Sequence, residues 1–289
     1  MKKLFYGCLA LMLAASCGER GTRTGPSETA TMEAELSDTA AAESPEEETQ
    51  LQLVKEQEVP ATADESFADF FFNFASDDDF QKERIVFPIS YYKGEEVLRT
   101  TRDDWQHDSL LSRSEVYTVM FDSDEDMYVE EDTSLTSVQV DMIYLVKRRV
   151  KRYYFERIND RWYLEAINME PVTDKSDDTE DFFTFYSRFA TDSVFQRERL
   201  HDPLAFVTAD PEDDFSILET TLDVGQWFAF RPPLLQEWLS NIHYGQPSSV
   251  DSRQKILEIK GFGNGFCNTL FFNLRQGLWR LMKFEDLSD

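Results

Sequence analysis

The chain has 289 residues and a formal net charge of −27, with a sequence pI near 4.4. This length is sufficient for about two domains of ordinary size. Because nucleic acids and anionic lipid surfaces are themselves negatively charged, such an acidic chain is not expected to bind either of them through its charge.

The first 16 residues have the pattern of a secretory signal. Lys2 and Lys3 precede a twelve-residue apolar run, which is too short to span a bilayer, and Ala15 and Ser16 are small residues placed directly before Cys17. Two cleavage products are compatible with this pattern: an ordinary secreted protein, or a lipoprotein whose new N-terminal Cys17 carries the lipid. The segment resembles a bacterial lipobox, with Leu13 one place further out than usual, and we favour lipidation at Cys17.

Residues 17–65 are predicted to form a disordered acidic tether. From Gly18 to Ser66 there is no aromatic residue, and Glu, Thr, Ala, Ser and Pro dominate, so the segment cannot bury enough apolar surface to offset its ordering entropy. An acidic binding arm is the alternative. We expect export and a lipid anchor in the bacterial cell envelope, facing either the periplasm or the outer surface. Cys267 would remain as the one unmodified cysteine, so no disulfide and no cysteine-rich metal site are predicted.

A duplicated unit of about a hundred residues makes up the rest of the chain. The residues Phe80-Gln81-Lys82-Glu83-Arg84 recur 115 positions later as Phe195-Gln196-Arg197-Glu198-Arg199, and Pro88 recurs as Pro203. The first repeat is placed at 66–171, a linker at 172–179 and the second repeat at 180–289. Because Glu83/Arg84 and Glu198/Arg199 occur in both copies, we interpret them as structural anchors.

Each repeat is predicted to begin with two helices. Apolar residues follow helical spacing in both copies, which is typical of a helix with one buried face: Phe67, Phe70, Phe71, Phe74 and Ala75, then Phe182, Phe185, Tyr186, Phe189 and Ala190. The spacings Asp78-x-x-Gln81 and Ser193-x-x-Gln196 match a capping box that would open a second, shorter helix.

Strands are predicted after the helices. Alternating apolar residues at 138–146, followed by 151–158 and 161–167, indicate strands in the first repeat, and 256–262, 269–274 and 278–284 are their counterparts in the second. Helices followed by a meander of strands indicate an α+β fold.

At this point the sequence resembles a known family. Tandem units with the Phe-Gln-x-Glu-Arg…Pro signature are similar to Bacteroides-type lipoproteins of unknown function with nuclear transport factor 2-like domains. The resemblance covers Ser66 to the C-terminus. It implies two cone-shaped domains, each with a curved antiparallel sheet around a long helix. Enzymes of that fold carry an Asp, His or Tyr dyad inside the cone.

No catalytic residue is predicted. The three histidines, His107, His201 and His243, have no histidine at the matching place in the other repeat, and the many Asp and Glu residues leave a carboxylate base possible in principle without identifying one. No cofactor and no metal are predicted either.

An aromatic segment of the second repeat is the first candidate site. Trp227, Phe230, Arg231 and Trp238 lie in a stretch that is much more polar in the first repeat. The rings could stack on a sugar while Arg231 holds an anionic group. The alternative, which we favour, is that the rings fill the seam between the two domains.

A basic block is the second candidate site. Lys147, Arg148 and Arg149 begin a run that continues through Lys151 and Arg152, in an otherwise acidic chain. The run could bind a phosphate, an acidic glycan or an acidic partner. A solvated hairpin tip, or contact with the chain's own acidic surface, is the favoured alternative.

The function that these features favour is a lipid-anchored envelope protein acting as a non-enzymatic binding or interaction module. Its partners would be the membrane, through the lipid, and either a carbohydrate or an envelope protein, with no nucleic acid. A hydrolase, isomerase or dehydratase using a carboxylate in one cone is the alternative, and a structural spacer is the third hypothesis.

Overall fold

The computed structural model describes residues 64–131, 134–172, 179–210, 213–245 and 252–288, all within one compact unit, Pro60–Asp289. The predicted signal peptide, nearly all of the tether, Cys17 and most of the 172–179 linker lie outside these residues. Within the described part of the chain, no helix is both long and apolar enough to cross a membrane.

The two repeats share the order of their two initial helices and their six strands. The first contains α2 (Phe67–Ser76), α3 (Asp78–Glu83), β1 (Ile85–Lys93), β2 (Glu96–Thr100), the 3₁₀ helix η1 (Leu110–Arg113), β3 (Val116–Phe121), the 3₁₀ helix η2 (Asp124–Glu131), β4 (Ser137–Tyr144), β5 (Arg149–Ile158) and β6 (Arg161–Pro171). The second contains α4 (Phe182–Thr191), α5 (Ser193–Arg199), β7 (Leu200–Asp210), β8 (Asp213–Leu222), α6 (Val224–Phe230), β9 (Trp238–His243), β10 (Gln254–Gly261), β11 (Cys267–Arg275) and β12 (Leu278–Asp286). The predicted helices and the last three strands of each repeat are confirmed.

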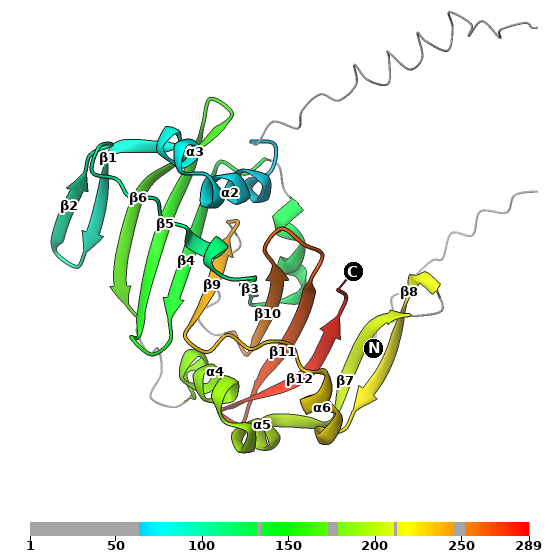
Figure 1. The fold of residues 1–289 in the computed structure, drawn as a ribbon. Coiled ribbons are helices and arrows are strands. Elements are labelled where there is room, and N and C mark those ends of the chain that lie inside the picture. The colour runs from blue at the N-terminus through cyan, green and yellow to red at the C-terminus, as the bar shows by residue number, and fades with distance from the viewer. Residues whose placement is uncertain (1–63, 132–133, 173–178, 211–212, 246–251, 289) are drawn as a thin grey trace, which may run out of the picture. The chain divides into compact units, whose positions relative to one another are not determined.

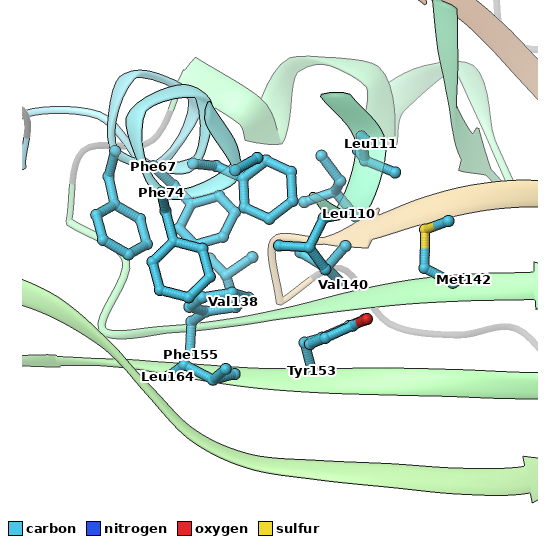
Figure 2. Close-up of a cluster of buried hydrophobic side chains, with 14 of the residues drawn as sticks. Phe67, Phe74, Leu110, Leu111, Val138, Val140, Met142, Tyr153, Phe155 and Leu164 are labelled. Atoms are coloured by element: carbon cyan, nitrogen blue, oxygen red, sulfur yellow. The ribbon is translucent and has the colours of Figure 1, made fainter. Parts of the chain in front are cut away.

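The first helix of each repeat buries the predicted apolar stripe. All ten predicted stripe residues are buried, and Phe70, Phe74 and Phe189 have no exposed surface. In the first repeat the rings of Phe70 and Phe74 pack edge-on against Phe155 of β5, with centroid distances of 5.7 and 5.3 Å. Figure 2 shows this cluster between α2 and the sheet. Aromatic pairs in this geometry stabilise a core beyond the burial of their area.

The two sheets exchange one strand each. One six-stranded sheet has the order β2-β1-β6-β5-β4-β9, and the other has the order β8-β7-β12-β11-β10-β3. Thus β9 of the second repeat pairs with β4 of the first, while β3 of the first repeat pairs with β10 of the second (Figure 1). Both pairs are antiparallel, whereas β1–β6 and β7–β12 are parallel. The repeats are therefore not self-contained, because each sheet is completed by the other repeat.

The exchanged strands meet at Thr118 of β3 and Ser240 of β9, both fully buried. The backbone N–H of Thr118 donates to Ser240 Oγ at 2.8 Å, and the backbone N–H of Ser240 donates to Thr118 Oγ1 at 2.8 Å. Each hydroxyl in turn donates to the other residue's carbonyl at 2.7 Å. Two residues 122 positions apart thus make the same contacts in both directions.

The predicted capping boxes are wrong by one residue. Asp77 caps α3 by accepting from Phe80 N, and Asp192 caps α5 by accepting from Val194 N and Phe195 N. Gln81 and Gln196 are buried instead and serve another purpose, because their amides bridge elements of the core.

Arg84 and Arg199 are structural anchors, as predicted, but they do not pair with the neighbouring Glu83 and Glu198. Arg84 makes a two-pronged ion pair with Asp64, at 2.7 and 2.9 Å, and Arg199 makes the same pair with Glu180, at 2.7 and 3.0 Å. Both carboxylates lie just before the first helix of their repeat. Bidentate pairs of this kind fix geometry as well as contributing energy, so each holds the helix start against its sheet.

Candidate functional site

The four residues of the predicted aromatic site do not form one exposed surface. Trp227 on α6 has no exposed surface and packs edge-on against Phe284 at 5.6 Å, inside the core of its own repeat. Trp238 on β9 is partly buried and packs against the core of the first repeat. Only Phe230 is a largely exposed ring. A fully buried ring cannot stack on a ligand, so the prediction of a shared stacking surface is not supported.

Trp227 has a counterpart in the first repeat that the sequence comparison missed. Its indole N–H donates to Gln196 Oε1 at 3.2 Å, as the indole N–H of Trp105 donates to Gln81 Oε1 at 3.0 Å. Arg231 also donates to Gln196 Oε1, at 2.7 Å. Because the same bond occurs in both repeats, we interpret Trp227 as part of a shared structural frame. By this frame we mean the Arg–carboxylate pair and the Trp–Gln hydrogen bond that each repeat contains.

The basic block is divided between three environments. Arg148 pairs with Asp181, the cap of α4, at 2.8 Å, in agreement with the favoured contact with the chain's own acidic surface. Lys147 is exposed and lies 5.8 Å from the centre of the Tyr144 ring. Arg149 is exposed as well. The three do not converge on one anion, and the residue of the run that enters a pocket is Lys151.

A pocket of about 270 Å³ opens on the inner face of the first sheet. Side chains alternate along a strand, so Lys151 and Tyr153 share the face of Phe155, which packs against α2. In Figure 2 the hydroxyl of Tyr153 points away from the phenylalanine rings. The pocket is lined by the apolar and aromatic residues Ile89, Tyr91, Trp105 and Ile167, and by the polar residues Thr100, Asp104, Gln106, Asp108 and Lys151.

Asp108 is the centre of a polar cluster at this pocket. Its Oδ2 accepts from Lys151 Nζ at 2.7 Å and from the Tyr153 hydroxyl at 2.7 Å. Its Oδ1 accepts from the backbone N–H of Leu110 at 3.2 Å and from Arg113 at 3.4 Å. The backbone of Asp108 is held in turn by Gln81, whose amide bonds both its N–H and its carbonyl. A core glutamine therefore positions the charged group at the pocket.

The electrostatics of the cluster keep Asp108 ionised. Burial alone would raise the pKa of Asp108. The charge and hydrogen bond of Lys151, with the hydrogen bonds from Tyr153 and the backbone of Leu110, outweigh burial and hold the pKa below its ordinary value. Burial, followed by the charge of Asp108, raises the pKa of Tyr153 well above its ordinary value. The group at the pocket is thus a fixed carboxylate–ammonium pair beside a neutral phenol.

We call the space between each sheet and the first helix of its repeat the first and the second cone. Side chains fill the second cone at the position where the first cone has its pocket. In the first sheet Tyr91 pairs with Ile167, and in the second Phe206 pairs with Phe284, at the same position of the parallel strand pair. The rings of Phe206 and Phe284 stack at 5.2 Å. By the same registers, residues of the second repeat that are at least nine-tenths buried replace those around the pocket: Leu204 for Ile89, Leu222 for Thr100, Asn268 for Lys151 and Leu270 for Tyr153.

Among the described residues, larger hollows also lie beside the β5–β6 turn, of about 460 Å³, and near the start of β10, of about 420 Å³. The first is bounded by exposed residues such as Val86 and Ile158, and the second by the exposed Arg253 and Arg275. Neither combines an apolar floor with a partly buried charged pair such as Lys151–Asp108. The smaller pocket of the first cone is therefore the better candidate site.

Comparisons with known proteins agree with this architecture. A family model described as a domain of unknown function (DUF4348) matches residues 46–286. The crystal structure of an NTF2-like protein from Bacteroides fragilis NCTC 9343 is 54% identical, with a TM-score of 0.76, over 80% of this chain and 99% of that one. No curated protein matches. The chain therefore belongs to the DUF4348 family of unknown function, and its α+β fold consists of two tandem nuclear transport factor 2-like domains.

Proposed function

We propose that the protein is a lipid-anchored envelope protein that binds a small molecule in the pocket of its first repeat without transforming it. The observation that carries the proposal is the difference between the cones. One holds a pocket with a fixed polar cluster, and the other is packed with stacked phenylalanines at the same place. A structural spacer would need no pocket in either cone.

The chemistry of Asp108 favours binding over catalysis. A general base works best when its pKa lies near the working pH and one oxygen is available to the substrate. The pKa of Asp108 is lowered, and all of its acceptor positions receive donors from the protein. The enzyme alternative would thus need another carboxylate, and Asp104 at the exposed rim is not held in a comparable way.

The second repeat supplies the variant that tests the pocket. Thr100→Leu with Ile167→Phe copies Leu222 and Phe284, which fill the second cone, and should close the first cone without unfolding it. A mixture of monosaccharides, amino acids and aromatic acids is screened by saturation-transfer NMR. We expect compounds that bind the wild type and not the closed variant. Equal signals from both proteins would overturn the proposal.

The envelope location is tested separately at Cys17. If Cys17 is acylated, the protein should take up labelled fatty acid. It should also partition into detergent, because two or more acyl chains give stable membrane attachment. Cys17→Ala should abolish both. Partitioning and labelling that do not change with this substitution would contradict the lipid anchor and leave the pocket proposal intact.

A further inference from the structure

The pocket contains an ammonium group whose hydrogen-bonding capacity the protein does not exhaust. Lys151 has three N–H donors, and within the described residues one of them is used, by Asp108 at 2.7 Å. The Nζ atom also lies 4.7 Å from the centre of the Tyr153 ring and 6.0 Å from that of Tyr91. The side chain is 19% exposed and lines the pocket, so its remaining donors are available to a ligand.

Asp108 cannot be the group that recognises the ligand. A carboxylate has about four acceptor positions, and Lys151, Tyr153, Leu110 and Arg113 supply four donors to this one. Its charge is offset by Lys151 and Arg113, so an incoming anion does not meet an uncompensated carboxylate. The role of Asp108 is to fix the position of the ammonium group.

A second cation leaves the same face of the sheet as Lys151. Arg149 precedes Lys151 by two residues on β5, so both side chains leave the same face of the sheet. Burial raises the pKa of Tyr91, and the positive charge of Arg149 opposes that rise. In the described part of the structure Arg149 has no salt bridge. The rim carboxylate Asp104 accepts from Thr101 at 2.6 Å.

Apart from the polar residues Thr100 and Gln106, the rest of the lining is apolar or aromatic. Ile89 and Ile167 are 1% and 4% exposed, and Tyr91 and Trp105 are partly buried rings beside them. The indole N–H of Trp105 is already used by Gln81, so this ring offers only apolar surface. A volume of about 270 Å³ lies just below the range of about 300–1,000 Å³ that is typical for drug-sized ligands, and suits a single ring.

We infer that this pocket binds a small carboxylic acid built on one six-membered ring, with the carboxylate on Lys151 and the ring against Tyr91, Trp105 and Ile167. This ligand class rests on the proposed function, since it assumes that the first cone is a binding site. A charge-assisted bond to a partly buried ammonium group is stronger than a neutral one and would orient the acid. An aromatic acid and a uronic acid share this chemistry and differ in the hydroxyls of the ring.

The test measures binding of benzoate and of glucuronate by calorimetry, each against its neutral analogue, benzamide or methyl glucoside. We expect one of the acids to bind the wild type, and its neutral analogue to bind about tenfold more weakly or not at all. Benzoate alone would identify the aromatic source, and glucuronate alone the sugar source. Lys151→Gln should weaken the binding of the acid by about tenfold. Lys151→Arg keeps the positive charge and should retain most of the binding.

Lys147→Gln is the matched control, because it removes an exposed charge from the same hairpin without lining the pocket. It should change affinity less than about twofold. The ligand class is overturned if neither acid binds at about 10 mM, or if the neutral analogues bind as well as the acids while the closed variant Thr100→Leu/Ile167→Phe still abolishes binding. Binding that survives in the closed variant would overturn the pocket itself. Melting temperatures of each variant separate these outcomes from unfolding.

Discussion

The first and second cones of this protein were made from one duplicated sequence and differ in what fills them. In the first, Tyr91 and Ile167 leave a pocket that reaches the Lys151–Asp108 pair. In the second, Phe206 and Phe284 stack across the same place. The difference indicates that folding requires the frame of the cone, while the space inside it can be either filled or kept open.

The frame itself is shared closely. Each repeat ties an arginine to a carboxylate before its first helix, and each buries a glutamine that accepts from a tryptophan N–H. These groups occur twice because each cone needs them to position its helices against its sheet. The polar cluster of Asp108, Lys151 and Tyr153 occurs once, which is why we place the function there.

Replacing the tryptophan that bonds the buried glutamine should lower the free energy of unfolding more in the second repeat than in the first. Trp227→Ala empties a fully buried site and should lower the free energy of unfolding by about 3–5 kcal/mol. Trp105→Ala removes a partly buried ring at the pocket and should cost about 1–2 kcal/mol. Urea unfolding of both variants measures the difference.

Phe230→Ala serves as the control, because this ring is 54% exposed and its loss should cost less than about 1 kcal/mol. A Trp227→Ala protein as stable as the wild type would mean that the tryptophan is a surface residue, as a stacking site would require. Trp227 and Trp105 would then no longer be equivalent residues of the two repeats.

The helices and the later strands could be predicted because their burial patterns are local. The stripe from Phe67 to Ala75 repeats every three or four residues, and 151–158 alternates, so each pattern is visible within its own segment. The first three strands of each repeat and α6 were not predicted. β1 and β7 each contain a proline, Pro88 and Pro203, and a register shift, so neither shows a continuous alternation.

The strand exchange and the pocket could not be predicted in this way. β3 and β9 are six residues each and show no regular alternation of buried and exposed positions, and periodicity does not say which strand lies beside another. Trp105 and Trp227 are 122 residues apart, while the segments before and after them align at offsets of 115 and 117. An alignment at a constant offset therefore does not pair the two tryptophans. Lys151 belongs to a basic run in the sequence, although alternation along β5 turns its side chain inward to Asp108 and that of Arg152 outward to Glu170.

A smaller effect is expected from Asp108, and it depends on pH. Asp108→Asn removes the charge that pairs Lys151 and should cost about 2–3 kcal/mol at neutral pH. The pKa of Asp108 is lowered in the folded protein, so its stabilisation is fully present above the unfolded pKa of about 3.9 and is lost as pH falls through the folded value. The wild type and the variant should therefore converge in stability on acidification, as measured by urea unfolding at about pH 7 and about pH 3.

Asp64 is the partner of Arg84 and also has a lowered pKa, so both proteins lose stability in acid for this shared reason. Only the difference between them reports Asp108. Asp104→Asn, at the exposed rim of the same pocket, should leave the curve of the wild type nearly unchanged. A difference for Asp108→Asn that is independent of pH would show that the ion pair with Lys151 does not contribute to stability.

The smallest effect concerns the crossing of β3 and β9, where the two repeats should behave alike. Thr118→Val and Ser240→Ala each remove a hydroxyl that accepts one backbone N–H and donates to one carbonyl at the crossing of β3 and β9. Each should cost about 1–2 kcal/mol, because a buried N–H is left without its acceptor. The two costs should agree within about 0.5 kcal/mol, since the contacts are the same in both directions. Urea unfolding of the single and double variants measures both values and their coupling. Costs that differ by more than about 1 kcal/mol would show that the exchange is energetically one-sided, and that the second repeat depends on the strand of the first more than the first depends on the second.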